Sequence, residues 1–155
     1  DITYVQLSNS IYALGDDIIV LDAYLAQYLT TITLPGNTQS IDLEFNPFNG
    51  YLYALSLNRL YVIDPLLNNV VSSTILSWNA SDMVINLSNG DIYISYSNTE
   101  RVDIFNSGNI LVNSINSWGA SFSGGAFNMT YNAFENDIYV VTNDTSDIVL
   151  RIDGA

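Results

Sequence analysis

Short runs of alternating apolar and polar residues recur along the chain and are separated by turn-forming residues. Residues 40–45, Ser-Ile-Asp-Leu-Glu-Phe, alternate as the residues of a half-buried strand do. Asn-Gly at 49–50 provides the positive φ angles of a tight hairpin, and further apolar runs follow at 51–56, 60–64 and 70–76. Strands of this length joined by short polar turns predict a four-stranded antiparallel meander.

The meander pattern repeats with a period near forty residues. Its marker is a tyrosine flanked by apolar residues, at positions 12, 53, 93 and 139, which are 41, 40 and 46 residues apart. This period is typical of β-propeller blades. We therefore predict an all-β single domain over residues 1–155, a β-propeller or propeller segment of about four blades, each a four-stranded antiparallel meander. The predicted blades span approximately 1–34, 39–77, 81–116 and 124–155, with the four tyrosines in the core between blades.

The fourth predicted blade lacks its outer strand. Its third strand, residues 148–153, would leave unpaired backbone groups beside Ile148, Leu150 and Ile152, and such an edge pairs readily with another strand. The missing strand could come from further blades or from another subunit, or the blade could have three strands. We expect the chain to belong to a larger parent chain, a homo-oligomer or a filament.

Two stretches carry a resemblance to a known family. The first is Ile-Tyr-Val-Val-Thr-Asn at 138–143, and the second is Asn-Pro-Phe-Asn-Gly-Tyr-Leu-Tyr at 46–53, followed by Tyr-Val-Ile-Asp-Pro at 61–65. These stretches resemble the YVTN-type β-propeller repeat of microbial cell-surface proteins. The resemblance implies a blade architecture and no particular chemistry. The third repeat departs from the pattern, with Asn106 in place of the aspartate that ends the strand and Leu87-Ser88 in place of Pro-Phe.

Composition excludes several functional classes. The 155 residues include 3 arginines, 16 acids and no lysine, histidine or cysteine, which gives a net charge of −13. Nucleic acids and anionic membranes attract clustered basic residues, so neither is an expected partner. Histidine and thiolate metal sites and Ser-His-Asp catalysis are also excluded. No apolar run is long enough for membrane insertion, and we expect no cofactor.

The same composition favours an extracellular or cell-surface location. Low total charge, abundant Asn, Ser and Tyr and missing lysine are the basis of this expectation, and abundant aspartate suggests an acidic habitat. Four sequons offer glycosylation sites, with the loop residues preferred: Asn79, Asn143, Asn128 and Asn86. Because asparagine is common here, sequons also arise by chance.

Two sets of residues are candidate binding sites. Trp78 and Trp118 lie at predicted crossovers between blades, and with Phe122 they could form an aromatic platform for a sugar or a partner chain. Packing between blades is the favoured alternative for the tryptophans. Acidic and amide side chains recur at the entry of the inner strands and could hold a cation such as calcium: Asp1, Asp42, Asp82 and Asn128. The favoured alternative is that each accepts a backbone hydrogen bond, as we also expect of Asp22, Asp64 and Asp153 at strand ends.

These observations predict a noncatalytic extracellular protein, structural or adhesive, that contacts other protein chains or glycans. The alternative is a carbohydrate-binding or carbohydrate-cleaving propeller that uses Trp78, Trp118 and acids near the channel. Cleavage requires two carboxyl groups at a suitable separation. The glutamates, Glu44, Glu100 and Glu135, fall at unrelated positions of the repeat and do not place such a pair.

Overall fold

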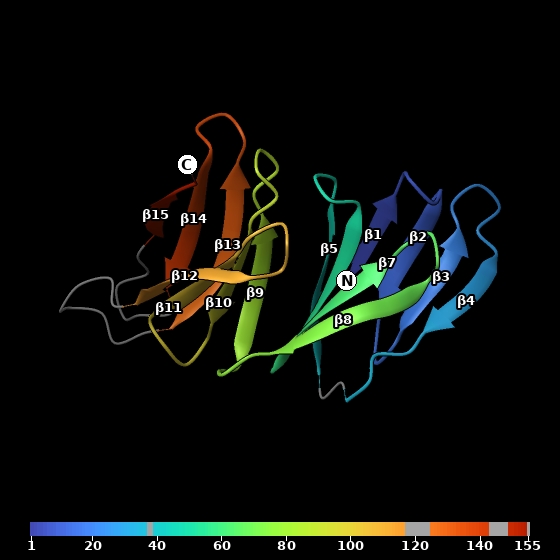
Figure 1. The fold of residues 1–155 in the computed structure, drawn as a ribbon, viewed down its shortest axis with the longest axis horizontal. Coiled ribbons are helices and arrows are strands. Elements are labelled where there is room, and N and C mark those ends of the chain that lie inside the picture. The colour runs from blue at the N-terminus through green and yellow to red at the C-terminus, as the bar shows by residue number, and fades with distance from the viewer. Residues whose placement is uncertain (37–38, 117–124, 143–148, 155) are drawn as a thin grey trace. The chain divides into compact units, whose positions relative to one another are not determined.

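The computed structural model is built from antiparallel β-strands and describes residues 1–36, 39–116, 125–142 and 149–154 (Figure 1). The chain divides into two compact units, residues 1–77 and 78–155, and each is described by itself. In the part of the chain that the structure describes, no helix could cross a membrane.

The first unit contains two four-stranded sheets whose strands follow chain order, β1-β2-β3-β4 and β5-β6-β7-β8. Their strands are β1 Ile2–Val5, β2 Ser10–Leu14, β3 Ile18–Asp22, β4 Tyr28–Ile32, β5 Ser40–Asn46, β6 Tyr51–Ser56, β7 Arg59–Asp64 and β8 Asn69–Ile75. All neighbours are antiparallel, so each sheet is the predicted meander.

The second unit contains one sheet of four strands, β9 to β12, and one of three, β13 to β15. Their strands are β9 Ala80–Ile85, β10 Ile92–Tyr96, β11 Arg101–Phe105, β12 Leu111–Asn116, β13 Ala126–Asn132, β14 Asp137–Thr142 and β15 Val149–Asp153. Among the described residues no fourth strand pairs with β15, which confirms the prediction that the last blade lacks its outer strand. Leu150 and Ile152 lie in this edge strand, whereas Ile148 is outside the described residues.

The same backbone conformation recurs in the turn before each repeat tyrosine. The residue three positions before the tyrosine in the sequence has a positive φ in all four sheets: Asn9, Gly50, Gly90 and Asn136. A second left-handed residue precedes the outer strand in the first three sheets: Ala26, Asn68 and Asn109. Glycine and asparagine adopt this region with little strain, which explains their placement in the repeat.

A side-chain cap holds the turn after each third strand. Asp22 Oδ1 accepts the N–H groups of Tyr24 and Leu25 at 2.8 and 2.7 Å. Asp64 Oδ1 accepts the N–H groups of Leu66 and Leu67 in the same way. The predicted role of both aspartates is therefore confirmed. Asn106 accepts two backbone N–H groups at 3.0 and 3.1 Å, and the departure from the family pattern therefore keeps the cap.

Each sheet has two chemically distinct faces, because side chains alternate across a strand. We call the face that carries the repeat tyrosine the tyrosine face, and the other the opposite face. In the first unit, Tyr12 and Val20 on the tyrosine face of the first sheet share one core with Leu43 and Tyr61 on the opposite face of the second. In the second unit, Tyr93 of the third sheet shares a core with the fourth sheet in the same way.

The repeat tyrosines differ in burial. Tyr12, Tyr53 and Tyr93 are at most 3% exposed, as predicted for core residues. Tyr139 is only partly buried, and its hydroxyl donates to Glu135 Oε2 at 2.8 Å. Tyr139 lies on a face that also exposes Val141 and Val149, and this exposure explains the difference.

Candidate functional site

The acids at the inner strands bind backbone rather than one another. Asp1 Oδ2 accepts the N–H of Leu43, in the inner strand of the next sheet, at 3.2 Å, and Asp42 Oδ1 accepts the same N–H at 2.8 Å. Asp82 Oδ2 in β9 accepts the N–H of Met129 in β13 at 2.5 Å. In the described ranges no three acids gather as metal ligands would. These bonds match the structural role that the sequence offered as the alternative to a cation site.

Asp82 is partly buried. Burial raises the pKa of its carboxyl above the ordinary value of 3.8, and the N–H groups of Met129 and Met83 oppose that shift. Burial also raises the pKa of Asp91, on the hairpin of the same sheet. Both carboxyl groups therefore bind a proton more tightly in the folded chain than in the unfolded chain.

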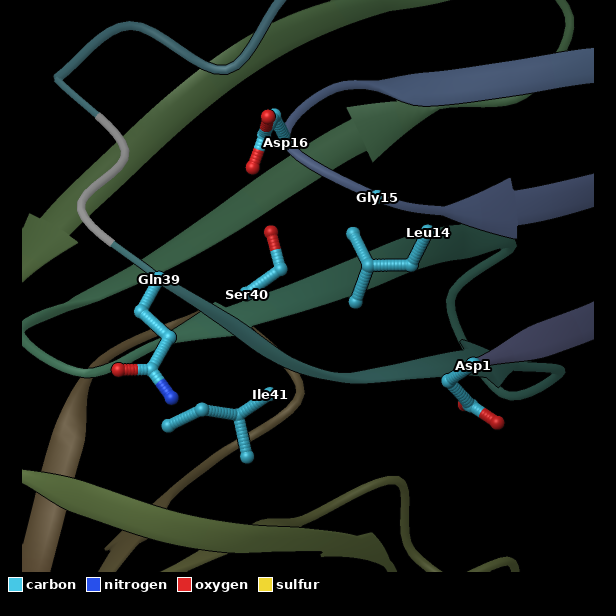
Figure 2. A pocket seen from close by; sticks show the side chains of 7 residues that line it. All are labelled: Asp1, Leu14, Gly15, Asp16, Gln39, Ser40 and Ile41. Carbon is cyan, nitrogen blue, oxygen red and sulfur yellow. The ribbon is translucent and has the colours of Figure 1, made fainter.

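A polar pocket of about 470 Å³ lies where β1 and β5 begin and β2 ends. It is lined by Asp1, Leu14, Gly15, Asp16, Gln39, Ser40 and Ile41. Figure 2 shows the carboxyl groups of Asp1 and Asp16 on either side of Leu14 in that view. Two acids, an amide and a hydroxyl suit water and small polar molecules, and their placement does not make a cage of carboxylates around a cation.

The predicted aromatic platform is described in part. Trp78 lies between β8 and β9 and is 45% exposed. Trp118 and Phe122 are outside the described residues. Of the three residues of the predicted platform, the structure therefore describes Trp78 alone, as a partly exposed residue.

The candidate glycosylation sites differ in accessibility. Asn79 and Asn128 are exposed, whereas Asn143 is outside the described residues. Asn86 is fully buried, and its Nδ2 donates to the carbonyl oxygen of Gly154 at 2.9 Å. A folded chain has no room for a glycan on that nitrogen, which corrects the assignment of Asn86.

A buried hydrogen-bond network in the third sheet had not been predicted. Tyr96 Oη donates to Asp103 Oδ2 at 2.7 Å, while Arg101 Nε and Ser114 Oγ donate to Asp103 Oδ1 at 2.7 and 2.6 Å. Burial, followed by the bond to the carboxylate, raises the pKa of Tyr96. The signal in the sequence was an acid inside the apolar strand 102–105, where a charge needs partners.

A second ion pair lies on the fourth sheet. Arg151 Nε and Asp137 Oδ2 are 2.7 Å apart, and the Asp137 side chain is 1% exposed. The bond to Asp137 raises the pKa of Arg151. The other carboxylate oxygen, Asp137 Oδ1, is buried and has no hydrogen-bond partner among the described residues. Asp137 alternates with Tyr139 and Val141 along β14, so it belongs to the tyrosine face.

Two sheet faces expose apolar side chains. On the opposite face of the first sheet, Ile2 is 63%, Tyr4 53% and Ile19 45% exposed. The tyrosine face of the fourth sheet exposes Val141 and Val149 beside a cavity of about 340 Å³. That cavity is lined by Asn128, Met129, Thr130, Tyr139, Val141 and Val149.

Comparison with known proteins identifies the architecture and no closer relationship. No protein-family model and no curated protein sequence matches the chain. Among solved structures it is similar to the hydrazine synthase of Kuenenia stuttgartiensis, with TM-score 0.79 and 15% identity over 94% of this chain and 43% of the other. It is also similar to the WD40 β-propeller domain of Doa1, with TM-score 0.74 and 14% identity over 97% of this chain and 49% of the other. The chain thus spans about half the length of these structures, and it has the fold of a β-propeller segment of four blades.

Proposed function

We propose that the chain is a noncatalytic structural or adhesive building block at a cell surface, where it contacts other protein chains. The observation that carries this proposal is the exposure of apolar side chains on regular sheet faces, such as Ile2 and Val149. Contiguous exposed apolar surface marks sites of protein interaction. The acids with catalytic potential support a structural role as well, since Asp1, Asp82 and Asp103 bind backbone or buried side chains.

A surface location is supported by the residues themselves. The YVTN-like stretches resemble repeats of microbial surface proteins, lysine is missing, and the sequon residues Asn79 and Asn128 are exposed. The test uses cells that make the chain and an antibody against it. Labelling of intact cells supports the proposal, and labelling only after permeabilisation contradicts it. Chymotrypsin added to intact cells should cut at Tyr24 and Phe134, which are 88% and 97% exposed.

Contacts with other chains are tested by cross-linking on the same cells. Amine-reactive reagents do not suit a chain without lysine, so carbodiimide with a dihydrazide is used to join the abundant carboxyl groups. Mass spectrometry should then find this chain joined to protein. A chain recovered without a cross-linked protein partner contradicts the proposed role.

A second candidate function, carbohydrate binding, is favoured by Trp78, an aromatic residue that is 45% exposed. An aromatic face open to solvent is a suitable stacking surface for a sugar ring. A glycan array tests it, with Trp78→Ala as the variant and Tyr24→Ala, another exposed aromatic, as the matched control. Binding that is lost only in Trp78→Ala supports this function, and an array without signal rejects it.

A further inference from the structure

The packing between neighbouring sheets follows one rule in both units. Tyr12 of the first sheet packs into the second sheet, where its hydroxyl donates to the Pro65 carbonyl oxygen at 2.8 Å. Tyr93 of the third sheet packs in the same sense into the fourth. An acid at the inner strand accompanies each contact: Asp1 accepts the N–H of Leu43, and Asp82 that of Met129. A tyrosine face thus docks on the opposite face of the following sheet.

The fourth sheet presents the docking half of this contact. Tyr139 occupies the repeat position of Tyr12, and Asn128, with an amide oxygen that can accept a hydrogen bond, occupies that of Asp82. Val141 and Val149, opposite each other on neighbouring strands, are 41% and 59% exposed beside the cavity on this face. The buried oxygen Asp137 Oδ1, also on this face, has no hydrogen-bond donor among the described residues.

The first sheet presents the receiving half. Strand register makes Ile2, Tyr4 and Ile19 the counterparts of Leu43, Phe45 and Tyr61 in the second sheet. Leu43 and Tyr61 are at most 1% exposed because the first sheet packs on them, whereas their counterparts Ile2 and Ile19 are 63% and 45% exposed. The first sheet therefore offers an apolar surface of the kind on which a tyrosine face docks.

We propose that these two faces bind each other between copies of the chain, with the tyrosine face of the fourth sheet of one copy on the opposite face of the first sheet of the next. This inference rests on the proposed role in protein contacts and names the partner as a second copy. Both complementary faces are present in one chain, and their contact would repeat the packing already formed by the first and second sheets. Two copies also have about the length of one of the similar propeller structures.

The charge at one position supports an interface between separate copies. Cross-strand register places Val20, Val62 and Ile104 beside the repeat tyrosines of the first three sheets, and these residues are at most 7% exposed. Beside Tyr139 the register places Arg151, whose side chain is 62% exposed and paired with Asp137. Arginine is mostly exposed in folded proteins, so a charged residue at this otherwise apolar position indicates a face that meets water before it associates.

The contact is heterologous, because the two faces differ. Such contacts close into a ring or continue as an open chain of copies. A glutamate in either face would be buried without a partner in the complex, which opposes association. Either substitution should therefore weaken association by at least about tenfold, since about 1.4 kcal/mol corresponds to a factor of ten.

The experiment measures mass by analytical ultracentrifugation of the purified chain over a range of concentrations. The parent should pass from 17.1 kDa to at least twice that mass. Ile19→Glu and Val141→Glu should each remain monomeric where the parent associates, while Leu67→Glu, at a turn residue that is 69% exposed, should behave as the parent does. Circular dichroism confirms that each variant is folded.

Mixing the two face variants gives the decisive result. Each retains one intact face, so the mixture should form a dimer with one contact and grow no further. A parent that is monomeric at all concentrations, a face variant that associates as the parent does, or a mixture that stays monomeric overturns the inference. These outcomes are independent of the cell-surface test: a monomer cross-linked to a different protein on intact cells keeps the proposed function and removes only the second copy.

Discussion

Tyr12 and Tyr139 occupy the same position of the repeat in opposite environments, which allows a matched test of the interblade hydrogen bond. The Tyr12 hydroxyl is fully buried, 2.8 Å from the Pro65 carbonyl oxygen, 3.0 Å from Asn68 Oδ1 and 3.1 Å from Ser8 Oγ. In Tyr12→Phe the buried Pro65 carbonyl oxygen loses its donor, and a buried acceptor without a donor costs about 1–3 kcal/mol. We expect the free energy of unfolding to fall by about 2 kcal/mol, which for this chain length lowers Tm by about 4–8 °C.

Tyr139→Phe removes the same hydroxyl from the exposed side of the fourth sheet, where its partner is Glu135. Water can replace that bond, so the expected loss is below about 0.5 kcal/mol. Both variants are unfolded in urea at pH 7 and followed by far-UV circular dichroism, at a concentration below that at which copies associate. The slope m should stay constant and the midpoint should move only for Tyr12→Phe. Equal losses in the two variants, or no loss in Tyr12→Phe, would refute the reasoning.

Three further changes test the fold. Ala26 has φ +52° where the next two sheets have asparagine, so Ala26→Asn should raise the urea midpoint by an equivalent of about 0.5–1 kcal/mol, and a lower midpoint would contradict the strain. Asp103→Ala removes a buried acceptor of three donors and should cost about 3–5 kcal/mol in the same assay, with a neutral result against it. The raised pKa of Asp82 means that the folded chain binds its proton more tightly, so stability should rise as pH falls through the folded pKa toward 3.8. When the free energy of unfolding is measured in urea at each pH, Asp82→Asn should lack the part of the rise that comes from this carboxyl. A parent chain whose stability falls steadily from pH 7 to pH 4 would contradict this.

The strands and their order could be predicted because they depend on local signals. Alternation over 40–45 and the apolar runs around Tyr53 and Tyr93 indicate which residues form strands, and the Asn-Gly turn at 49–50 determines how two of them pair. The observed strands differ from the predicted ones by a few residues at their ends. The caps at Asp22 and Asp64 were also predictable, since the N–H groups that each aspartate accepts belong to the second and third residues after it in the sequence.

The interactions that set the candidate sites depend on residues far apart in the sequence. The bond of Asp82 to Met129 joins positions 47 residues apart, and no local pattern distinguishes that aspartate from a cation ligand. Burial of Asn86 likewise depends on Gly154, in the last sheet.

Periodicity alone also leaves open which faces of a repeat are covered. Ile2 and Leu43 have the same chemistry and the same place in the repeat, yet one is exposed and the other is buried.

A deviation from the repeat carries more information, because a position that faces a permanent core must stay apolar. Arg151 stands where the earlier sheets place valine or isoleucine, and it is the one charged residue of that register series. If the tyrosine face of the fourth sheet were permanently covered like those of the first and third sheets, Arg151→Val would stabilise the isolated chain by burial. Because we infer that this face is exposed until a second copy binds, a valine here gains no burial in the dilute chain. The substitution also leaves the buried Asp137 carboxylate without its bond to Arg151. We therefore expect the unfolding free energy of the dilute chain to fall by about 1–3 kcal/mol. A large gain in stability at low concentration would instead indicate that the face is covered within a single copy.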